Sequence, residues 1–169
     1  VKVVDSGVIA YAHYNGDHSP RREILPMRSL KVSDVMWNHI EPVRCGTQLT
    51  KVVKTLLHNH VTGLPVVDDQ RHVIGFISEQ DCIHALLVSG YHREGDPLVD
   101  DVMFRKPVTI SAEMSVVDLA QNLGAGKPKV YPVVDHGKLI GIVTRTAILA
   151  ELARTGFGLE PPKHASAEY

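Results

Sequence analysis

The feature that most constrains the fold of this 169-residue chain is an internal repeat. The sequence VSDVM at 32–36 returns as VDDVM at 99–103, and LPVVD at 64–68 returns as YPVVD at 131–135, both displaced by 67 residues. After the loss of one residue in a turn, VIGFIS at 73–78 matches LIGIVT at 139–144. Three anchors in the same order indicate a duplication, so the chain contains two copies of one structural unit.

Each copy begins with a short strand and a helix. Residues 40–43 and 107–110 are strand candidates, and a proline in each favours a strand start or an edge. The first helix is predicted from apolar residues at i, i+3, i+4, i+7 and i+8 from Leu49, with Thr47 as its N-cap. The second is capped by Ser115 and stops early at Gly124-Ala-Gly126.

Each copy then continues with two strands and a closing helix. The strands are expected at 64–67 and 73–77 in the first copy, and at 130–134 and 139–143 in the second. Ser78 and Thr144 are the expected N-caps of the closing helices. The apolar stripes predicted along these two helices consist of Ile83, Leu86 and Leu87 and of Ile148, Leu149 and Leu152.

The repeated unit is therefore β-α-β-β-α, and the fold class is α+β. A unit of about 55 residues buries little apolar surface alone, so we expect the two repeats to pack about a pseudo-two-fold axis. Residues 1–4 and 8–12 are candidates for a strand or hairpin. The expected organisation is an N-terminal extension at 1–31, repeats at 32–90 and 99–154, a linker at 91–98 and a flexible tail at 155–169.

Composition argues against several classes of function. The chain has 18 basic and 19 acidic residues, which gives no electrostatic support for a nucleic-acid partner. No apolar run approaches the ~20 residues of a membrane span. Two cysteines, Cys45 and Cys82, are too few for a disulfide framework and favour a cytoplasmic location. Ten histidines are present, but none of the usual zinc-site spacings occurs, so we expect no metal.

The repeated motifs resemble those of paired cystathionine-β-synthase (CBS) domains, also called a Bateman module. The resemblance covers residues 32–153 and consists of the D-V-M opening, the P-V-V-D strand and a G-h-h-[ST]-x-x-D ending, where h is apolar. It implies a homodimer that binds adenosine derivatives (AMP, ADP, ATP or S-adenosylmethionine) in clefts between the repeats.

The ending motif has a physical reason to bind a nucleotide. A carboxylate three residues after a Ser or Thr at a helix start is placed to accept hydrogen bonds from ribose hydroxyls, and the N–H groups of the first turn suit a phosphate. The motif is complete at Gly75–Asp81, whereas Ala147 replaces the carboxylate in the second copy. The same Ser-x-x-Asp pattern is also an ordinary helix cap.

In the CBS family the motif of one repeat faces adenine held by the other. On that resemblance the favoured nucleotide cleft consists of Phe76, Ser78, Asp81, Thr109, Ile110, Lys129 and Val130. Lys129 would contact a phosphate with help from Lys127, although an exposed lysine is more often only solvated. A second, weaker cleft would consist of Pro42, Val43, Val61, Thr62, Thr144 and Arg145.

The sequence thus favours a regulatory module that senses an adenine nucleotide and biases an unidentified protein partner. The alternative is a structural dimerisation module whose clefts are vestigial, which the loss of the carboxylate at Ala147 makes credible. An enzyme is not expected, because no Ser-His-Asp or Cys-His arrangement and no phosphate-binding G-x-x-x-x-G-K-[ST] loop is present.

Overall fold

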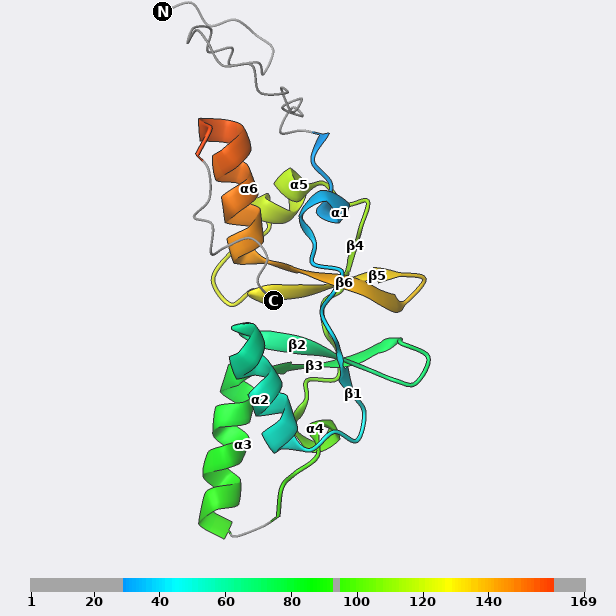
Figure 1. The fold of residues 1–169 in the computed structure, drawn as a ribbon, viewed down its shortest axis with the longest axis vertical. Helices are drawn as coiled ribbons and strands as arrows, with labels where there is room; N and C mark the ends of the chain where they lie inside the picture. The colour runs from blue at the N-terminus through cyan, green and yellow to red at the C-terminus, as the bar shows by residue number, and fades with distance from the viewer. Residues whose placement is uncertain (1–28, 93–94, 160–169) are drawn as a thin grey trace, which may run out of the picture.

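Two three-stranded sheets with helices on one side make up the fold (Figure 1). The computed structural model describes residues 29–92 and 95–159, so the predicted strands at 1–4 and 8–12 lie outside the described residues. The first repeat contains α1 (Val32–Val35), β1 (Val43–Arg44), α2 (Leu49–Asn59), β2 (Gly63–Val67), β3 (Val73–Ser78) and α3 (Glu79–His92). The second contains α4 (Val99–Val102), β4 (Ile110–Ser111), α5 (Val116–Gln121), β5 (Val130–Asp135), β6 (Lys138–Thr144) and α6 (Arg145–Phe157). The α+β class and the tandem repeat are confirmed.

Both sheets have the same topology. The first strand of each sheet pairs in parallel with the second, which pairs antiparallel with the third. The register shifts at equivalent places, between Val66 and Val67 and between Val133 and Val134. The turns of the two hairpins also meet, because the N–H of Val73 donates to the carbonyl of Gly137 at 3.2 Å. The sheets are therefore joined through the backbone as well as through side chains.

The first strands are shorter than predicted. β1 begins only at Val43 and β4 only at Ile110, the last residues of the predicted strands at 40–43 and 107–110. The chain that leads to β1 first pairs with the other repeat, since Trp37 forms a backbone bridge to Ile142. The predicted strands therefore overlap with a crossing between repeats.

Helix capping follows the sequence at three starts, where Ser78, Ser115 and Thr144 are the caps, and departs from it at the start of α2. The Ser115 and Thr144 hydroxyls accept hydrogen bonds from Asp118 and Ala147, as predicted. The expected cap at Thr47 is wrong, because its hydroxyl donates to the Arg44 carbonyl at 2.7 Å. α2 is capped by a linker residue instead, Asp96, whose carboxylate accepts from the N–H of Thr50 at 3.1 Å.

The segment that opens each repeat packs on the opposite repeat. The first opening segment, residues 30–37, places Leu30 and Val32 in the core of the second repeat, with 2% and 0% of their surfaces exposed. The N–H of Val32 donates to the Met114 carbonyl at 2.9 Å, and Trp37 exchanges two backbone hydrogen bonds with Ile142.

The second opening segment, residues 98–104, makes the reciprocal contacts. Val99 and Met103 are buried in the core of the first repeat. The N–H of Val99 donates to the Thr47 carbonyl at 2.8 Å, and Phe104 exchanges two backbone hydrogen bonds with Phe76. Each core is therefore completed by residues that the sequence repeat assigns to the other copy.

Two glycines make this exchange sterically feasible. A Cβ atom built on Gly141 would lie 2.7 Å from the backbone oxygen of Trp37, and one on Gly75 would lie 2.3 Å from the sulfur of Met103. These residues are equivalent in the two repeats and belong to β6 and β3. The opening segments can lie this close to the strands only because these positions have no side chain.

The closing helices expose much of their predicted apolar stripes. Ile83, Leu86 and Leu87 on α3 are exposed, and so is Leu149 on α6, at 69%. Ile148 is buried as a core residue. The apolar spacing identifies a helix, but here most of the stripe lies outside the two cores.

Candidate functional site

The complete Ser-x-x-Asp motif lies at the junction of β3 and α3. One carboxylate oxygen of Asp81, Oδ2, accepts hydrogen bonds from the N–H and the hydroxyl of Ser78, at 2.9 and 2.5 Å. The Ser78 hydroxyl in turn accepts from the N–H of Asp81 at 3.3 Å. The other oxygen, Oδ1, has no hydrogen-bond partner in the described part of the chain. The motif is thus a helix cap that still leaves one acceptor of a half-buried carboxylate open.

The structure brings part of the other predicted half close to this motif. Val130, from the second repeat, is buried in the same core as Ile77, the neighbour of Ser78. Strands β2 and β5 are in contact, and Figure 1 shows that α3 and α6 leave the sheets at the same edge. Lys129 and Thr109 are exposed, whereas Ile110 is buried in the core of the second repeat. Ile110 and Val130 therefore expose little of their side chains, and their place in the cleft stays a prediction.

Phe76 is held by the second opening segment. Its backbone forms hydrogen bonds with that of Phe104. Its ring lies so close to Gly63 that a Cβ atom there would be 2.4 Å from the ring and would clash with it. Its position therefore depends on the contact between repeats.

The residues predicted for the second cleft are mostly used by the fold. Val43 and Val61 are buried in the first core, and the Thr62 carbonyl accepts from the N–H of Glu79 at 3.1 Å. Thr144 is buried and caps α6, where Ala147 leaves no carboxylate.

Arg145 was predicted to supply charge to this second cleft, and the structure gives its guanidinium another role. It donates to the carbonyls of Pro128, Gly124 and Lys127, at 3.1, 3.0 and 2.7 Å. The guanidinium N–H groups thus donate to three carbonyls of one loop, and the side chain holds the loop between α5 and β5 in place.

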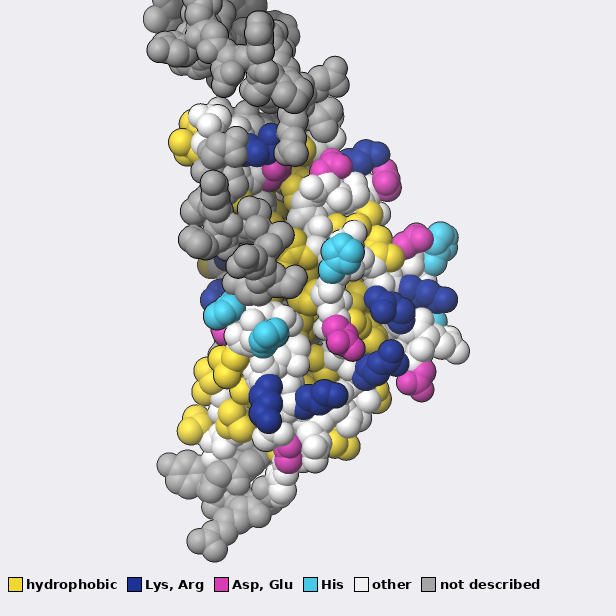
Figure 2. Space-filling model, viewed as in Figure 1, with side chains coloured by type: hydrophobic (Ala, Val, Ile, Leu, Met, Phe, Trp, Pro, Cys, Tyr) yellow, Lys and Arg dark blue, Asp and Glu magenta, His cyan; other side chains and the backbone are white. Residues whose placement is uncertain are grey.

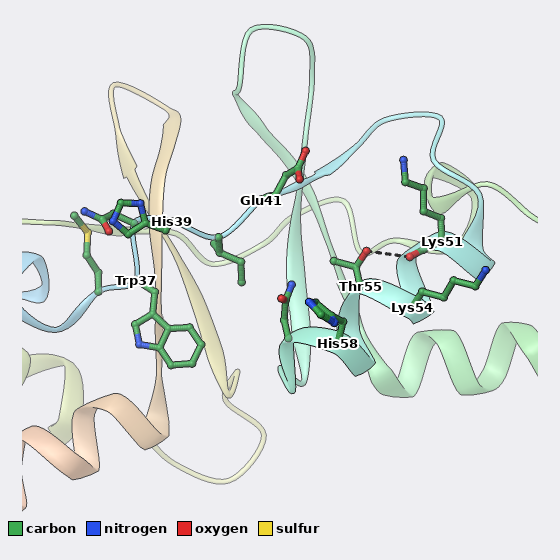
Figure 3. Close-up of a pocket in the computed structure, with 11 residues that line it drawn as sticks. Trp37, His39, Glu41, Lys51, Lys54, Thr55 and His58 are labelled. Atoms are coloured by element: carbon green, nitrogen blue, oxygen red, sulfur yellow. Dashed lines mark hydrogen bonds between the residues drawn. The ribbon is translucent and has the colours of Figure 1, made fainter. Parts of the chain in front are cut away.

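A cavity of about 780 Å³ lies beside the second cleft, between the chain at 36–41 and helix α2. From α2 it is lined by Lys51, Lys54, Thr55, His58 and Asn59. Figure 3 shows Trp37 next to the second repeat at one end, and the two lysines at the other. We call this cavity the Trp37 pocket.

Sequence reasoning missed the Trp37 pocket. Its α2 residues lie on the polar side of an amphipathic helix, where charged residues are usually only solvated. The one available signal is the spacing of Lys51, Lys54 and His58 at i, i+3 and i+7, which places these three residues on one face.

The two cysteines are not activated nucleophiles. Cys82 is buried, and burial raises the pKa of its thiol to about 11. The exposed Cys45 thiol donates to the Asp100 carboxylate at 2.6 Å, and this hydrogen bond raises its pKa. Both thiols therefore stay protonated at neutral pH.

The part of the chain that the structure describes has neither a metal site nor a helix that could span a membrane. No three His, Cys, Asp or Glu side chains within 29–92 and 95–159 are grouped to hold a metal ion. Over the same ranges, no helix combines the length and the apolar character needed to cross a bilayer.

Comparison with known proteins accounts for this arrangement. The CBS domain profile matches residues 32–88 and again residues 99–154. The chain belongs to the CBS domain family. The resemblance seen in the repeated motifs is thereby confirmed, as a tandem pair of CBS domains.

Other CBS proteins share both sequence and fold with this chain. The crystal structure of CBSX2 in complex with AMP is 31% identical, with a TM-score of 0.61 over 70% of this chain and 92% of that one. CBSX1 of Arabidopsis thaliana is 27% identical over 61% of this chain, and the uncharacterized protein MJ1225 of Methanocaldococcus jannaschii is 27% identical over 74%. This CBS pair corresponds to 55% and 44% of those two relatives, about half their length.

Proposed function

We propose that this CBS pair is a regulatory module that binds an adenine nucleotide at the Ser78–Asp81 motif, in a cytoplasmic setting, and that it is not an enzyme. The observation that carries the proposal is the free Oδ1 of Asp81 beside the first turn of α3, where a ribose hydroxyl has an acceptor. The solved relative CBSX2 binds AMP, which supports the same ligand class here.

The contact between the repeats explains how such a ligand would regulate. The motif belongs to the first repeat, while Val130 and Lys129 belong to the second, so a ligand touching both sides would favour one arrangement of the repeats over others. A ligand shifts such an equilibrium only by its difference in affinity for the two arrangements. The shift would then pass to a partner protein.

We expect Asp81→Ala to weaken AMP binding by at least about tenfold, because the open acceptor is lost. Isothermal titration calorimetry with AMP, ADP, ATP and S-adenosylmethionine measures this. Asp118→Ala is the matched control, since Ser115 and Asp118 form another Ser-x-x-Asp cap that lies outside the cleft. No binding of any of these ligands at millimolar concentration, or equal losses in the two variants, would contradict the proposal.

We also propose that the CBS pair forms a homodimer through α3 and α6. These helices lie on the same side of the sheets and expose Ile83, Leu87 and Leu149 at 60%, 58% and 69%. Figure 2 shows hydrophobic side chains gathered at the lower left, where α2 and α3 lie. Exposed apolar side chains clustered on helices are typical of an interface.

Leu87→Glu is expected to convert this dimer to a monomer, because a carboxylate would have to be buried in an apolar interface. Light scattering coupled to size-exclusion chromatography measures the mass. Val108→Glu, at a residue that is 55% exposed and belongs to neither helix, should leave the dimer intact. A tight dimer whose stability is unaffected by every nucleotide would favour the alternative function, a purely structural dimerisation module.

A further inference from the structure

The loop between α5 and β5 is longer than its counterpart in the first repeat. It consists of residues 122–129, whereas the connection between α2 and β2 consists of residues 60–62 only. Gly124 and Gly126 both lie in the longer loop, and glycine allows the backbone more conformations than any other residue. Without a further contact, this loop would therefore hold its last residue, Lys129, less firmly than a short connection would.

Arg145 supplies that further contact. Its guanidinium donates to the carbonyls of Gly124, Lys127 and Pro128, which lie in the second half of the loop or at its middle. Its backbone N–H donates to the carbonyl of Lys129 at 3.0 Å. A single residue at the start of α6 thus holds both the loop and the residue with which the loop ends.

The first repeat has the same backbone bond but lacks the side-chain contact. Glu79 stands where the second repeat has Arg145, and its N–H donates to the Thr62 carbonyl at 3.1 Å. An ionised carboxylate has no hydrogen to donate to a carbonyl. Arg145 is the first residue of α6, where a cation is unfavourable because the helix dipole is positive at that end. The side chain therefore serves the long loop rather than the helix.

Lys129 lies next to the contact between the second repeat and the Ser78–Asp81 motif. The following residue, Val130, is buried in the first core together with Ile77, which directly precedes the motif. The Lys129 side chain is exposed, and among the described residues its ammonium group has no ion-pair or hydrogen-bond partner. An unpaired ammonium group at this place suits the phosphate of a nucleotide whose ribose contacts the motif.

We propose that Arg145 is a positioning residue for nucleotide binding, because it holds residues 124–129 in the conformation from which Lys129 reaches the phosphate. This inference deepens the proposed function and rests on it for the ligand. It adds that Arg145 contributes to the affinity for AMP but not to the affinity for adenosine, and that it does so only while Lys129 is present.

The experiment is a double-mutant cycle on the full chain, with Arg145→Gln, Lys129→Gln and the two together. Isothermal titration calorimetry measures the affinity of each variant for AMP and for adenosine. We expect each single variant to lose about tenfold in affinity for AMP and less than about twofold for adenosine, and the double variant to lose no more than Lys129→Gln alone. Arg105→Gln is the matched control, because the Arg105 guanidinium also donates to a backbone carbonyl, that of Asp100, and this variant should bind AMP as the unmodified chain does.

Backbone order parameters from NMR relaxation give a second measurement, made without ligand. We expect those of Gly124 and Gly126 to fall from about 0.85 in the unmodified chain to below about 0.6 in Arg145→Gln, because the loop is released. Unchanged order parameters, losses that add in the double variant, or equal losses for AMP and adenosine would overturn the role of Arg145 and leave the proposed function standing. An unmodified chain that binds neither ligand would contradict the proposed function itself, and the role of Arg145 would fall with it.

Discussion

Gly141→Ala is expected to lower the free energy of unfolding by about 3 kcal/mol, although it adds only one methyl group. The added Cβ would lie 2.7 Å from the Trp37 carbonyl oxygen, and backbone cannot move aside as a flexible side chain can. The first opening segment would have to leave β6, which breaks the two hydrogen bonds between Trp37 and Ile142, each worth about 1 kcal/mol, and loosens the core packing beside them. Urea denaturation followed by circular dichroism measures the loss.

Gly124→Ala provides the control for this substitution. A Cβ atom at Gly124 would meet no atom within 4 Å, so we expect a change within about 0.5 kcal/mol, of either sign. Equal stability of the two variants would show that the first opening segment does not lie against β6.

Val99→Ala and Val32→Ala are expected to cost about 2 kcal/mol each and to weaken opposite repeats. Both side chains are completely buried, but Val99 belongs to the first core and Val32 to the second. Native-state amide hydrogen exchange should therefore be faster in β2 and β3 for Val99→Ala, and faster in β5 and β6 for Val32→Ala. The reverse pattern would mean that each opening segment packs on its own repeat.

The sequence predicts the fold well where the signal is local. The duplication, the four longer strands and the caps at Ser115 and Thr144 all follow from spacing and residue type. The exchange of opening segments could not be predicted in this way. An apolar pattern indicates that Val32 and Val99 are buried, but it does not say which of two similar cores receives them.

The candidate site was predictable only in part, because several of its contacts join residues that are far apart in sequence. Asp81 was identified because the two copies of the motif can be compared, and the second copy has Ala147 at the equivalent position. The expected cap at Thr47 is wrong, because Asp96 lies far away in sequence but close enough in space to cap α2. The place of Arg145 in a cleft stays a prediction, and its guanidinium donates to loop carbonyls that no local pattern indicates. The Trp37 pocket forms only when the first opening segment crosses to the second repeat, so no local pattern indicates it.

The exchanged segments also set the order in which this chain can fold during synthesis. The first core lacks Val99 and Met103 until those residues leave the ribosome, although the buried residues that the first repeat itself supplies end with Cys82. Val130 and Ile142 belong to the same core and emerge later still. The core of the first repeat therefore cannot be completed until most of the second repeat has been translated. The two repeats fold together rather than one after the other.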